Sequence, residues 1–237
     1  MVTLGADWQT GSWEADDIAE ASPYHQKKRL LDVVLASIAL LMLLPVFLVV
    51  AIAVRLDSRG SILYAQERVG LDRRRGKGAT PIRGNRRKLH SYGKPFTIYK
   101  FRSMVADAEK LTGPVWAKER DPRATRIGGL LRRTHLDELP QLLNVLRGEM
   151  SMVGPRPERP QLFGSLVAQI PEYALRCRTL PGITGIAQIK NGYDDSLQSA
   201  ARKVQYDLYY IRKGSAIMDL RILMATALVL AKGKQQE

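Results

Sequence analysis

The chain has 237 residues, of which 45% are hydrophobic, and this is enough to bury the core of one domain. A disordered chain and a disulfide-stapled miniprotein are therefore excluded, because the single cysteine, Cys177, cannot form an internal bridge. The formal net charge of +14 points to anionic partners, namely nucleic acid, acidic lipid headgroups or phosphorylated substrates.

The chain begins with an acidic segment that is followed by an apolar one. Residues 1–25 contain five acidic and no basic residues and show no periodicity, which predicts a mobile tail. From Val33 to Val54 no residue is charged, and as a helix at roughly 1.5 Å per residue this run would extend about 33 Å. That length can span a membrane. A cleavable signal peptide fits poorly because the run is too long, and a buried core helix is the remaining alternative.

Two features of this segment favour a helix that enters and leaves the membrane by the same face. Pro45 removes a helical hydrogen bond in the middle of the run, so a kink is expected there. Basic residues flank both ends, from Lys27 to Arg29 and again from Arg55, and the positive-inside rule draws both ends to the cytoplasmic side. Kinked spanning helices are common, however, so these features alone leave a span and a re-entrant helix equally open.

The next residues predict a β-hairpin with a basic loop. Residues 61–70 and 94–104 are β-branched and aromatic with approximate alternation, as expected for two strands. The loop from Arg73 to His90 is rich in Lys and Arg. It either contacts anionic lipid or is a solvated insertion. A nucleic-acid role is less favoured because the run lacks aromatic residues that would stack on bases.

Short helices follow along the chain. Apolar spacing predicts helices at residues 124–134 and 138–148, the second ending at Gly148. Two more helical stretches lie within residues 157–178 and are broken at Pro171, and residues 181–189 suggest a glycine turn leading into a strand. Helical periodicity returns from Asp195 to Lys213. The last apolar stretch, before Lys232, is too short to span a membrane and suits a core or an interfacial helix.

Two adjacent carboxylates, Asp137 and Glu138, are the most informative polar residues. Pro140 is tolerated only in the first turn of a helix, so the helix should begin near Asp137, and an Asp there is ordinarily a structural N-cap. Arginines precede the pair, at Arg132 and Arg133, and another follows in a Gly-Pro-Arg-Pro turn. A helix N-terminus among arginines is an anion site. Carboxylates belong there only with a divalent cation or a covalent step.

At these residues the sequence resembles the monotopic phosphoglycosyl transferases, also called the bacterial sugar transferase family. The resemblance runs from about Lys28 to Lys232. Its pieces, in family order, are KRLLDVVLA, YKFRSM, DPRATRIGGLLRRTHLDELPQLLNVLRGEMSMVGPRPE, PGITGIAQI and KVQYDLYYI. Each piece alone could occur by chance, whereas all of them in order form a strong signal.

The resemblance implies an enzyme that transfers a phosphosugar from a nucleoside diphosphate sugar, usually a UDP-sugar, to a polyprenol phosphate such as undecaprenyl phosphate. UMP is released, and assembly of a surface glycan or exopolysaccharide begins. The resemblance also implies a helix that re-enters at Pro45 and a dyad of Asp137 and Glu138 that binds Mg²⁺, with the phosphosugar carried covalently on the aspartate. Candidate substrate contacts are Lys100, Arg102, Arg132, Arg156, Pro181, Gly182, Thr184, Gly185 and Gln188.

Three departures from the family pattern stand out. Leu44 replaces the Ser that often precedes the helix-breaking proline, the loop from Arg73 to His90 is longer and more basic than usual, and no multi-span region precedes the apolar helix. The chain is therefore expected to be the minimal catalytic form. Neither the residues nor the resemblance identifies the sugar or the glycan pathway.

We therefore expect an α+β fold, mostly helical, with a small β-hairpin, interfacial amphipathic helices and a re-entrant helix-break-helix. Residues 1–25 should form the tail, 26–57 the membrane helix and 58–237 a catalytic domain on the cytoplasmic face of the bacterial inner membrane. The expected partners are the nucleotide sugar, the polyprenol phosphate and anionic inner-leaflet lipids, without nucleic acid, and a homodimer stays open. The alternative is a non-catalytic, membrane-anchored basic module that binds acidic lipid or nucleic acid, which would not explain two carboxylates among arginines.

Overall fold

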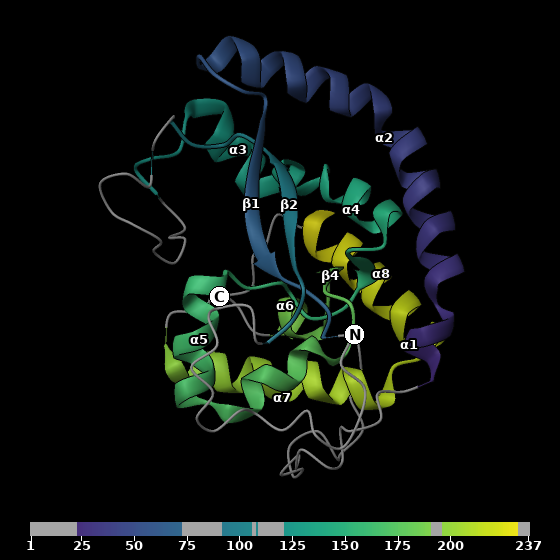
Figure 1. The fold of residues 1–237 in the computed structure, drawn as a ribbon. Coiled ribbons are helices and arrows are strands. Elements are labelled where there is room, and N and C mark those ends of the chain that lie inside the picture. Colours follow the sequence, from purple (N-terminus) through teal and green to yellow (C-terminus); the bar gives the residue numbers. More distant parts are fainter. Residues whose placement is uncertain (1–22, 73–91, 106–107, 109–120, 191–195, 232–237) are drawn as a thin grey trace.

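The computed structural model describes residues 23–72, 92–105, 108, 121–190 and 196–231. Its first element, α1 (Tyr24–Lys27), leads into the long helix α2 (Arg29–Asp57). Most of the acidic tail and the whole basic loop predicted from the sequence lie outside the described residues, so their predicted roles stay predictions. The remaining elements are helical apart from two pairs of short strands, as the α+β prediction requires (Figure 1).

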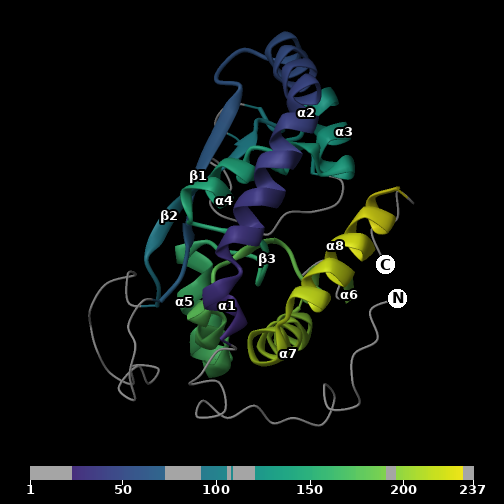
Figure 2. The ribbon, with the colours of Figure 1, turned by 90° about the vertical axis from the view of Figure 1, so that its right-hand side faces the viewer.

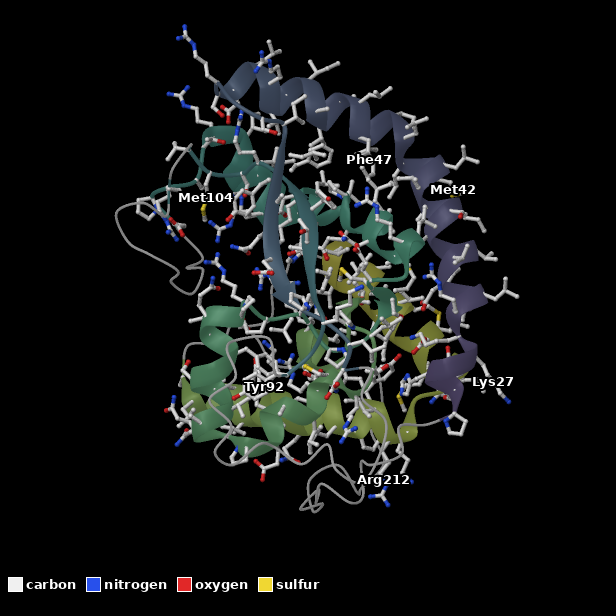
Figure 3. The ribbon with its side chains drawn as sticks, viewed as in Figure 1. Lys27, Met42, Phe47, Tyr92, Met104 and Arg212 are labelled. Atoms are coloured by element: carbon white, nitrogen blue, oxygen red, sulfur yellow. The ribbon has the colours of Figure 1, made fainter. Side chains whose placement is uncertain are left out.

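Helix α2 is continuous through Pro45 but bends in its middle, so that its two limbs run in different directions (Figures 1 and 2). Met42 lies on one limb and Phe47 on the other, which places the bend around Pro45, as the sequence predicted (Figure 3). Within the described residues α2 is the one helix long and apolar enough to cross a membrane.

The two sides of α2 differ in their surroundings. Met42 is 75% exposed, whereas the ring of Phe47 packs edge-on against Phe101 of the hairpin, with the ring centroids 5.5 Å apart (Figure 3). Ala36, Val50 and Val54 are buried against the body. Large apolar side chains cover the other side, and this sets α2 apart from the core helix of a soluble protein. The most exposed of them are Leu30, Leu41, Met42, Val49, Ile52 and Leu56.

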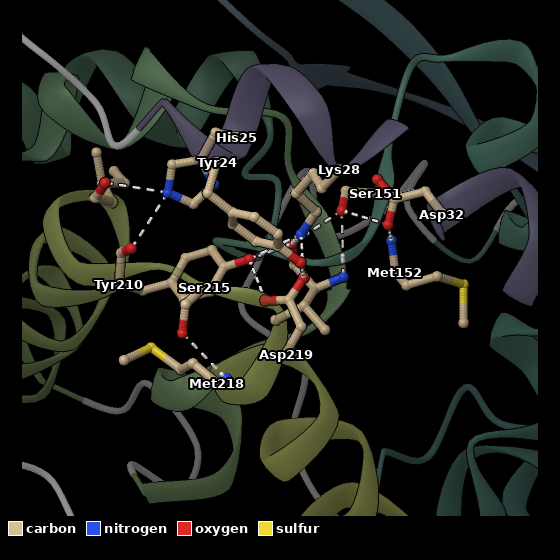
Figure 4. A network of polar contacts seen from close by, with 12 residues as sticks. Tyr24, His25, Lys28, Asp32, Ser151, Met152, Tyr210, Ser215, Met218 and Asp219 are labelled. Atoms are coloured by element: carbon tan, nitrogen blue, oxygen red, sulfur yellow. Dashed lines mark hydrogen bonds and ion pairs between the residues drawn. The ribbon is translucent and has the colours of Figure 1, made fainter. Parts of the chain in front are cut away.

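The start of α2 is fixed by buried polar contacts (Figure 4). The ammonium of Lys28 lies 2.6 Å from the carboxylate of Asp219 and donates to Tyr210 Oη and the Val153 carbonyl. Arg29 donates to the carbonyls of Val145 and Leu146, at the end of a neighbouring helix. These two basic residues therefore have structural partners inside the protein, so they are weaker evidence for membrane topology than their place in the sequence suggested.

The predicted hairpin is confirmed. Strands β1 (Leu63–Val69) and β2 (Pro95–Phe101) are antiparallel, with Tyr64 opposite Lys100 and Arg68 opposite Phe96. Directly opposite residues share a face of the sheet, and side chains alternate between faces along a strand. Lys100 and Arg68 therefore lie on the same face as Phe96 and Ile98, which are buried in the core.

Most of the remaining elements match the predicted boundaries. The helices are α3 (Arg126–Thr134), η3 (Leu136–Glu138), α4 (Gln141–Arg147), α5 (Pro160–Gln169), η4 (Pro171–Arg178), α6 (Ile186–Lys190), α7 (Leu197–Lys213) and α8 (Ala216–Ala231), where η denotes a 3-10 helix. The predicted stop at Gly148 is confirmed, because this residue has a φ of 78° and its amide donates back to Val145.

Two local predictions were wrong. Asp137 is not the N-cap of the leucine-rich helix, since α4 begins at Gln141 and Pro140 precedes it. The chain first makes the 3-10 turn η3, because the i→i+3 bond from the Leu139 amide to the Leu136 carbonyl forms before Pro140, which has no amide hydrogen. The strand expected at 181–189 is shorter, because β4 (Gly182–Thr184) ends at Thr184 and α6 begins at Ile186.

The C-terminal half forms the larger core. Strand β3 (Ser151–Val153), which the sequence did not reveal, pairs with β4 in parallel. Helices α5, η4, α6 and α7 pack around this pair and bury Phe163, Tyr173, Leu208 and Ile211. Helix α8 buries Ile222, which confirms the core alternative for one side, and exposes apolar residues at helical spacing on its opposite side, whose interfacial role stays a prediction. The exposed residues are Ile217, Leu220, Met224 and Leu228.

Candidate active site

The two carboxylates lie in η3, immediately after a sharp change in chain direction. His135 has a φ of 55°, the left-handed conformation, and separates α3 from η3. This is the one positive φ among the described non-glycine residues. The Glu138 amide then donates to the His135 carbonyl at 3.1 Å. The turn places Asp137 and Glu138 side by side, and both are largely buried, at 6% and 8% exposure.

Glu138 is held by two cations that come from distant parts of the chain. The Lys100 ammonium, on β2, lies 2.7 Å from Glu138 Oε1. The Arg156 guanidinium approaches both carboxylate oxygens and lies 3.0 Å from Oε2. Burial raises the pKa of Glu138, but Arg156 and Lys100 lower it by more, so the pKa is held well below its ordinary value. Glu138 is therefore ionised, and both its oxygens are occupied.

Asp137 has the opposite environment. Its carboxylate accepts no hydrogen bond from any side chain or amide in the part of the chain that the structure describes. Burial raises the pKa of Asp137 to about 6, although Lys100 draws it down, and the neighbouring charge on Glu138 raises it further. Two adjacent carboxylates thus have pKa values pushed in opposite directions, a pattern found where paired acids take different catalytic roles.

Arg132 approaches the dyad from α3. Its guanidinium lies 3.8 Å from the carboxylate of Asp121, which also binds Arg123 at 2.7 Å. The charge on Arg132 also lowers the pKa of Asp137. The structure therefore brings together five of the sequence-predicted site residues: Lys100, Arg132, Asp137, Glu138 and Arg156.

Arg102 lies elsewhere and has other partners. Its guanidinium donates to the carbonyls of Val54 at 3.1 Å and Ser58 at 2.6 Å, where α2 ends, and it also donates to the Ser61 carbonyl. A helix end leaves carbonyls without intrahelical partners, and a cation there is favourable. In this structure Arg102 caps α2.

Replacing Arg102 with Met is therefore expected to destabilise the fold by about 1–3 kcal/mol, because the partly buried carbonyls of Val54 and Ser58 lose a charged donor. Thermal unfolding in detergent micelles measures the change. Arg59→Met is the matched control, since Arg59 is exposed nearby and should leave the unfolding midpoint unchanged. An unchanged midpoint for Arg102→Met would contradict the capping role.

The predicted glycine turn is hydrogen-bonded to the Gly-Pro-Arg-Pro turn. The Gly182 amide donates to the Pro155 carbonyl, and the Gly154 amide donates to the Thr184 carbonyl, both at 2.9 Å. A Cβ on Gly182 would lie 2.0 Å from the Gly154 backbone nitrogen, so only glycine fits there. Gln188 Nε2 donates to the Ile183 carbonyl, and Thr184 Oγ1 lies 2.7 Å from Thr226 Oγ1. Pro181 and Gly185 lie in the same segment, and their carbonyls accept from the amides of Ser151 and Gln188. The contacts of these five predicted residues are therefore with the protein's own backbone and side chains.

Sequence reasoning missed Arg68 and Arg176. Arg68 Nη1 donates to the Pro157 carbonyl at 3.0 Å, and Arg176 Nη2 donates to the Arg156 carbonyl at 2.9 Å. A signal existed for Arg68, because a charged residue on the core-facing side of a strand needs a partner. Nothing in the sequence distinguishes Arg176 from the neighbouring Arg178, because both lie in a short 3-10 helix.

Comparison with known proteins identifies the class to which this fold and site belong. The model of a family described as bacterial sugar transferase matches residues 23–233. The Escherichia coli K12 protein named UDP-glucose:undecaprenyl-phosphate glucose-1-phosphate transferase is 41% identical over 202 residues, which cover 84% of this chain and 39% of that protein. The chain belongs to the bacterial sugar transferase family.

Two further relatives show how the chain relates to proteins of different length. An Aeromonas hydrophila protein named UDP-N-acetylgalactosamine-undecaprenyl-phosphate N-acetylgalactosaminephosphotransferase is 36% identical, over 87% of this chain and 44% of its own length. The exopolysaccharide production protein PSS of Rhizobium leguminosarum is 40% identical, over 87% of this chain and 96% of its own length. The chain thus spans about two fifths of the length of the Escherichia coli and Aeromonas relatives.

Proposed function

We propose that the chain is a phosphoglycosyl transferase that moves a sugar 1-phosphate from a UDP-sugar to undecaprenyl phosphate, at the first membrane step of exopolysaccharide assembly. The observation that carries the proposal is the dyad, in which a buried Asp137 without a hydrogen-bond partner among the described residues lies beside a Glu138 saturated by Lys100 and Arg156. The names of the Escherichia coli and Aeromonas relatives include a UDP-sugar and undecaprenyl phosphate, which supports this choice of substrates.

Asp137 acts as the nucleophile. Its carboxylate oxygen forms a bond to the sugar-bearing phosphorus of the donor, and the bond from that phosphorus to the bridging oxygen breaks, so UMP leaves with the electron pair. An oxygen of undecaprenyl phosphate then attacks the same phosphorus, and the Asp137 carboxylate is released. A carboxylate that accepts no hydrogen bond from the described residues and that is ionised at neutral pH suits this role.

The cations around the dyad stabilise the reacting phosphoryl group. Phosphoryl transfer depends chiefly on positioning and on electrostatic stabilisation of the equatorial oxygens. Arg156 is 36% exposed at its side chain, so its outward surface can reach a diphosphate while it stays paired with Glu138. Arg132 and Lys100 provide further positive charge, so the site repels neither the anionic donor nor the anionic lipid.

The donor set fits Mg²⁺. No group of three or more candidate ligands occurs within the described residues, and Mg²⁺ commonly binds one or two carboxylates together with substrate phosphates and water. Asp137 would hold the ion, and Glu138 could contribute if one of its two ion pairs opened. Bound there, Mg²⁺ would reduce the repulsion between the carboxylate and the diphosphate.

We further propose that the enzyme lies on the cytoplasmic face of the inner membrane, with α2 re-entrant. The exposed apolar sides of α2 and α8 suit contact with lipid. The bend at Pro45 allows both limbs to leave by one face, and the basic residues after α2 favour that face being cytoplasmic. The predicted loop from Arg73 to His90 would add attraction to anionic lipid.

This topology predicts that both ends of α2 are protected from reagents outside the cell. In a Cys177→Ala background, single cysteines replace Pro23 and Ser61, which are exposed and uncharged. An impermeant thiol reagent added to spheroplasts should label neither cysteine, and it should label both after lysis. Labelling of one site but not the other from outside would mean that α2 spans the membrane.

The transfer reaction itself is tested by UMP release. The purified chain in detergent is incubated with undecaprenyl phosphate and with UDP-glucose, UDP-galactose, UDP-N-acetylglucosamine or UDP-N-acetylgalactosamine in turn. Release of UMP with one donor supports the proposal and identifies the sugar, which pocket shape decides and the family does not. Folded protein that binds anionic vesicles but releases no UMP from any donor would favour the non-catalytic module.

A further inference from the structure

The loop that carries Arg156 is tied at four successive backbone carbonyls. Each carbonyl accepts a hydrogen bond from a different residue. One donor lies in β4, one in η4 and two in β1. The carbonyls of Pro155, Arg156, Pro157 and Glu158 accept, in that order, from the Gly182 amide at 2.9 Å, the Arg176 guanidinium at 2.9 Å, the Arg68 guanidinium at 3.0 Å and the Val69 amide at 2.9 Å.

Arg176 is itself held in place by a buried ion pair. Its Nε lies 2.7 Å from Asp207 Oδ2, and both side chains are only 2% exposed. Its guanidinium also lies over the ring of Tyr173, with 4.5 Å between the guanidinium carbon and the ring centroid. A buried ion pair alone contributes little net stability, because desolvation opposes the attraction. Stability alone therefore does not explain why Arg176 is buried here, and its bond from Nη2 to the Arg156 carbonyl suggests a second role.

The bond from Arg176 to the Arg156 carbonyl helps to hold the Arg156 side chain at Glu138. The Arg156 side chain is 36% exposed, so burial does not confine its guanidinium to Glu138. Pro155 and Pro157 restrict the backbone on either side of Arg156, and the tied carbonyls restrict the rotation that remains. A loop fixed in this way presents the guanidinium to Glu138 before substrate arrives, so the enzyme does not have to order it during the reaction.

We propose that Arg176, oriented by Asp207, is a positioning residue of the active site, which fixes the backbone of Arg156 and thereby keeps its guanidinium on Glu138. The geometric part of this inference stands on the contacts alone. Its kinetic consequence rests on the proposed transferase function, so the two parts have separate measurements.

The geometric part is measured by amide hydrogen exchange in detergent. Arg176→Met keeps side-chain bulk and removes the bond to the carbonyl. The amides of Val69, Gly154 and Gly182, which make the backbone hydrogen bonds around this loop, should therefore exchange faster. Val204→Ala is the stability control, because Val204 is fully buried in the core on α7 and its apolar side chain makes none of the four bonds to the loop. Exchange at the loop that rises no more in Arg176→Met than in Val204→Ala would overturn the proposal.

The kinetic part is measured by a double-mutant cycle on the initial burst of UMP. Arg176→Met should slow the burst by about 10- to 100-fold in the wild-type background, as expected when a transition-state contact is misplaced. In an Arg156→Met background the same change should have little further effect, because Arg176 acts through Arg156. Equal fold losses in both backgrounds would instead make Arg176 a general structural residue.

A second variant covers the case in which Arg176→Met does not fold. Arg176→Lys keeps a charge for Asp207 but lacks the planar fork that reaches both the carboxylate and the carbonyl, so it should fold and give an intermediate change in exchange and burst rate. Wild-type exchange and burst rate in this variant would also overturn the proposal. If wild-type protein releases no UMP from any donor, the transferase proposal fails, while the exchange experiment still decides whether Arg176 positions the loop.

Discussion

Replacing Asp137 with Asn is expected to abolish the release of UMP in the absence of lipid acceptor, together with the retention of labelled sugar phosphate on the protein. An amide of the same shape cannot attack phosphorus, so the loss of rate should be on the order of 10³-fold or more. Rapid-quench measurement of UMP gives the rate, and protein precipitated after incubation with labelled UDP-sugar gives the adduct.

The same substitution should not weaken the fold. The Asp137 carboxylate accepts no hydrogen bond from the described residues, so the amide breaks none of those contacts. Because burial raises its pKa to about 6, the folded state holds its proton to higher pH than the unfolded chain does, and the ionised carboxylate destabilises the folded state above that pH. Asp137→Asn should therefore raise the unfolding midpoint at pH 7.5. The gain should shrink as the pH falls below about 6 and vanish below the ordinary carboxyl pKa of about 3.9.

Glu67→Gln is the matched control, because Glu67 is an exposed carboxylate on β1 and should leave both burst and stability unchanged. A burst that survives in Asp137→Asn would favour direct transfer from donor to lipid. The same conclusion would follow if the wild type released UMP only when undecaprenyl phosphate was present. Asp137 would then be a ligand of the metal or of the donor.

The sequence predicted those parts of the fold that depend on local patterning. Alternation gave the hairpin from Leu63 to Phe101, and Gly148 ended α4 as expected, because each signal lies within a few residues of its effect. The dyad was recognised because two carboxylates among arginines are unusual. Its conformation was not predicted, since the left-handed conformation of His135 is set by how α3 and η3 pack together.

The pairing within the site could not be predicted, because it joins segments far apart in the chain. Lys100 and Glu138 are separated by 38 residues and Arg176 and Asp207 by 31, and each pair forms only when β2, η4 and α7 take their places. Lys28 gave a misleading signal for the same reason. Its partner, Asp219, lies 191 residues away, so the sequence alone suggested a charge at the membrane surface.

The separate roles of the two carboxylates follow from this pairing. Glu138 has both oxygens engaged by Lys100 and Arg156, so it is poorly placed to attack phosphorus or to take a proton from the lipid phosphate. Its negative charge instead fixes the two cations and raises the pKa of Asp137. We therefore propose that Glu138 orders the charges around Asp137, the nucleophile of the proposed mechanism.

This assignment predicts a distinctive pH dependence. In the wild type the burst rate should rise with pH and reach half its maximum near pH 6, because only the ionised Asp137 attacks. Glu138→Gln should slow the burst by about 10²-fold, since the cations lose the anion that fixes them. It should also move the midpoint to lower pH, because the charge that raised the pKa of Asp137 is gone and Lys100 and Arg156 now act on Asp137 unopposed.

The burst, the adduct yield and the pH midpoint of Glu138→Gln together distinguish the ordering role from two alternatives, a proton acceptor and a second nucleophile. A proton acceptor for the lipid phosphate would act in the second half of the reaction, so its loss would slow turnover with lipid and leave the burst intact. A second nucleophile would form its own adduct, and Glu138→Gln would then lower the adduct yield in proportion to the burst. Of these three roles, the ordering role alone gives a slower burst, a full final yield of adduct on Asp137 and a midpoint below that of the wild type. A midpoint that stays in place or rises would contradict the assignment, since removing a neighbouring negative charge must favour ionisation of the carboxyl that remains.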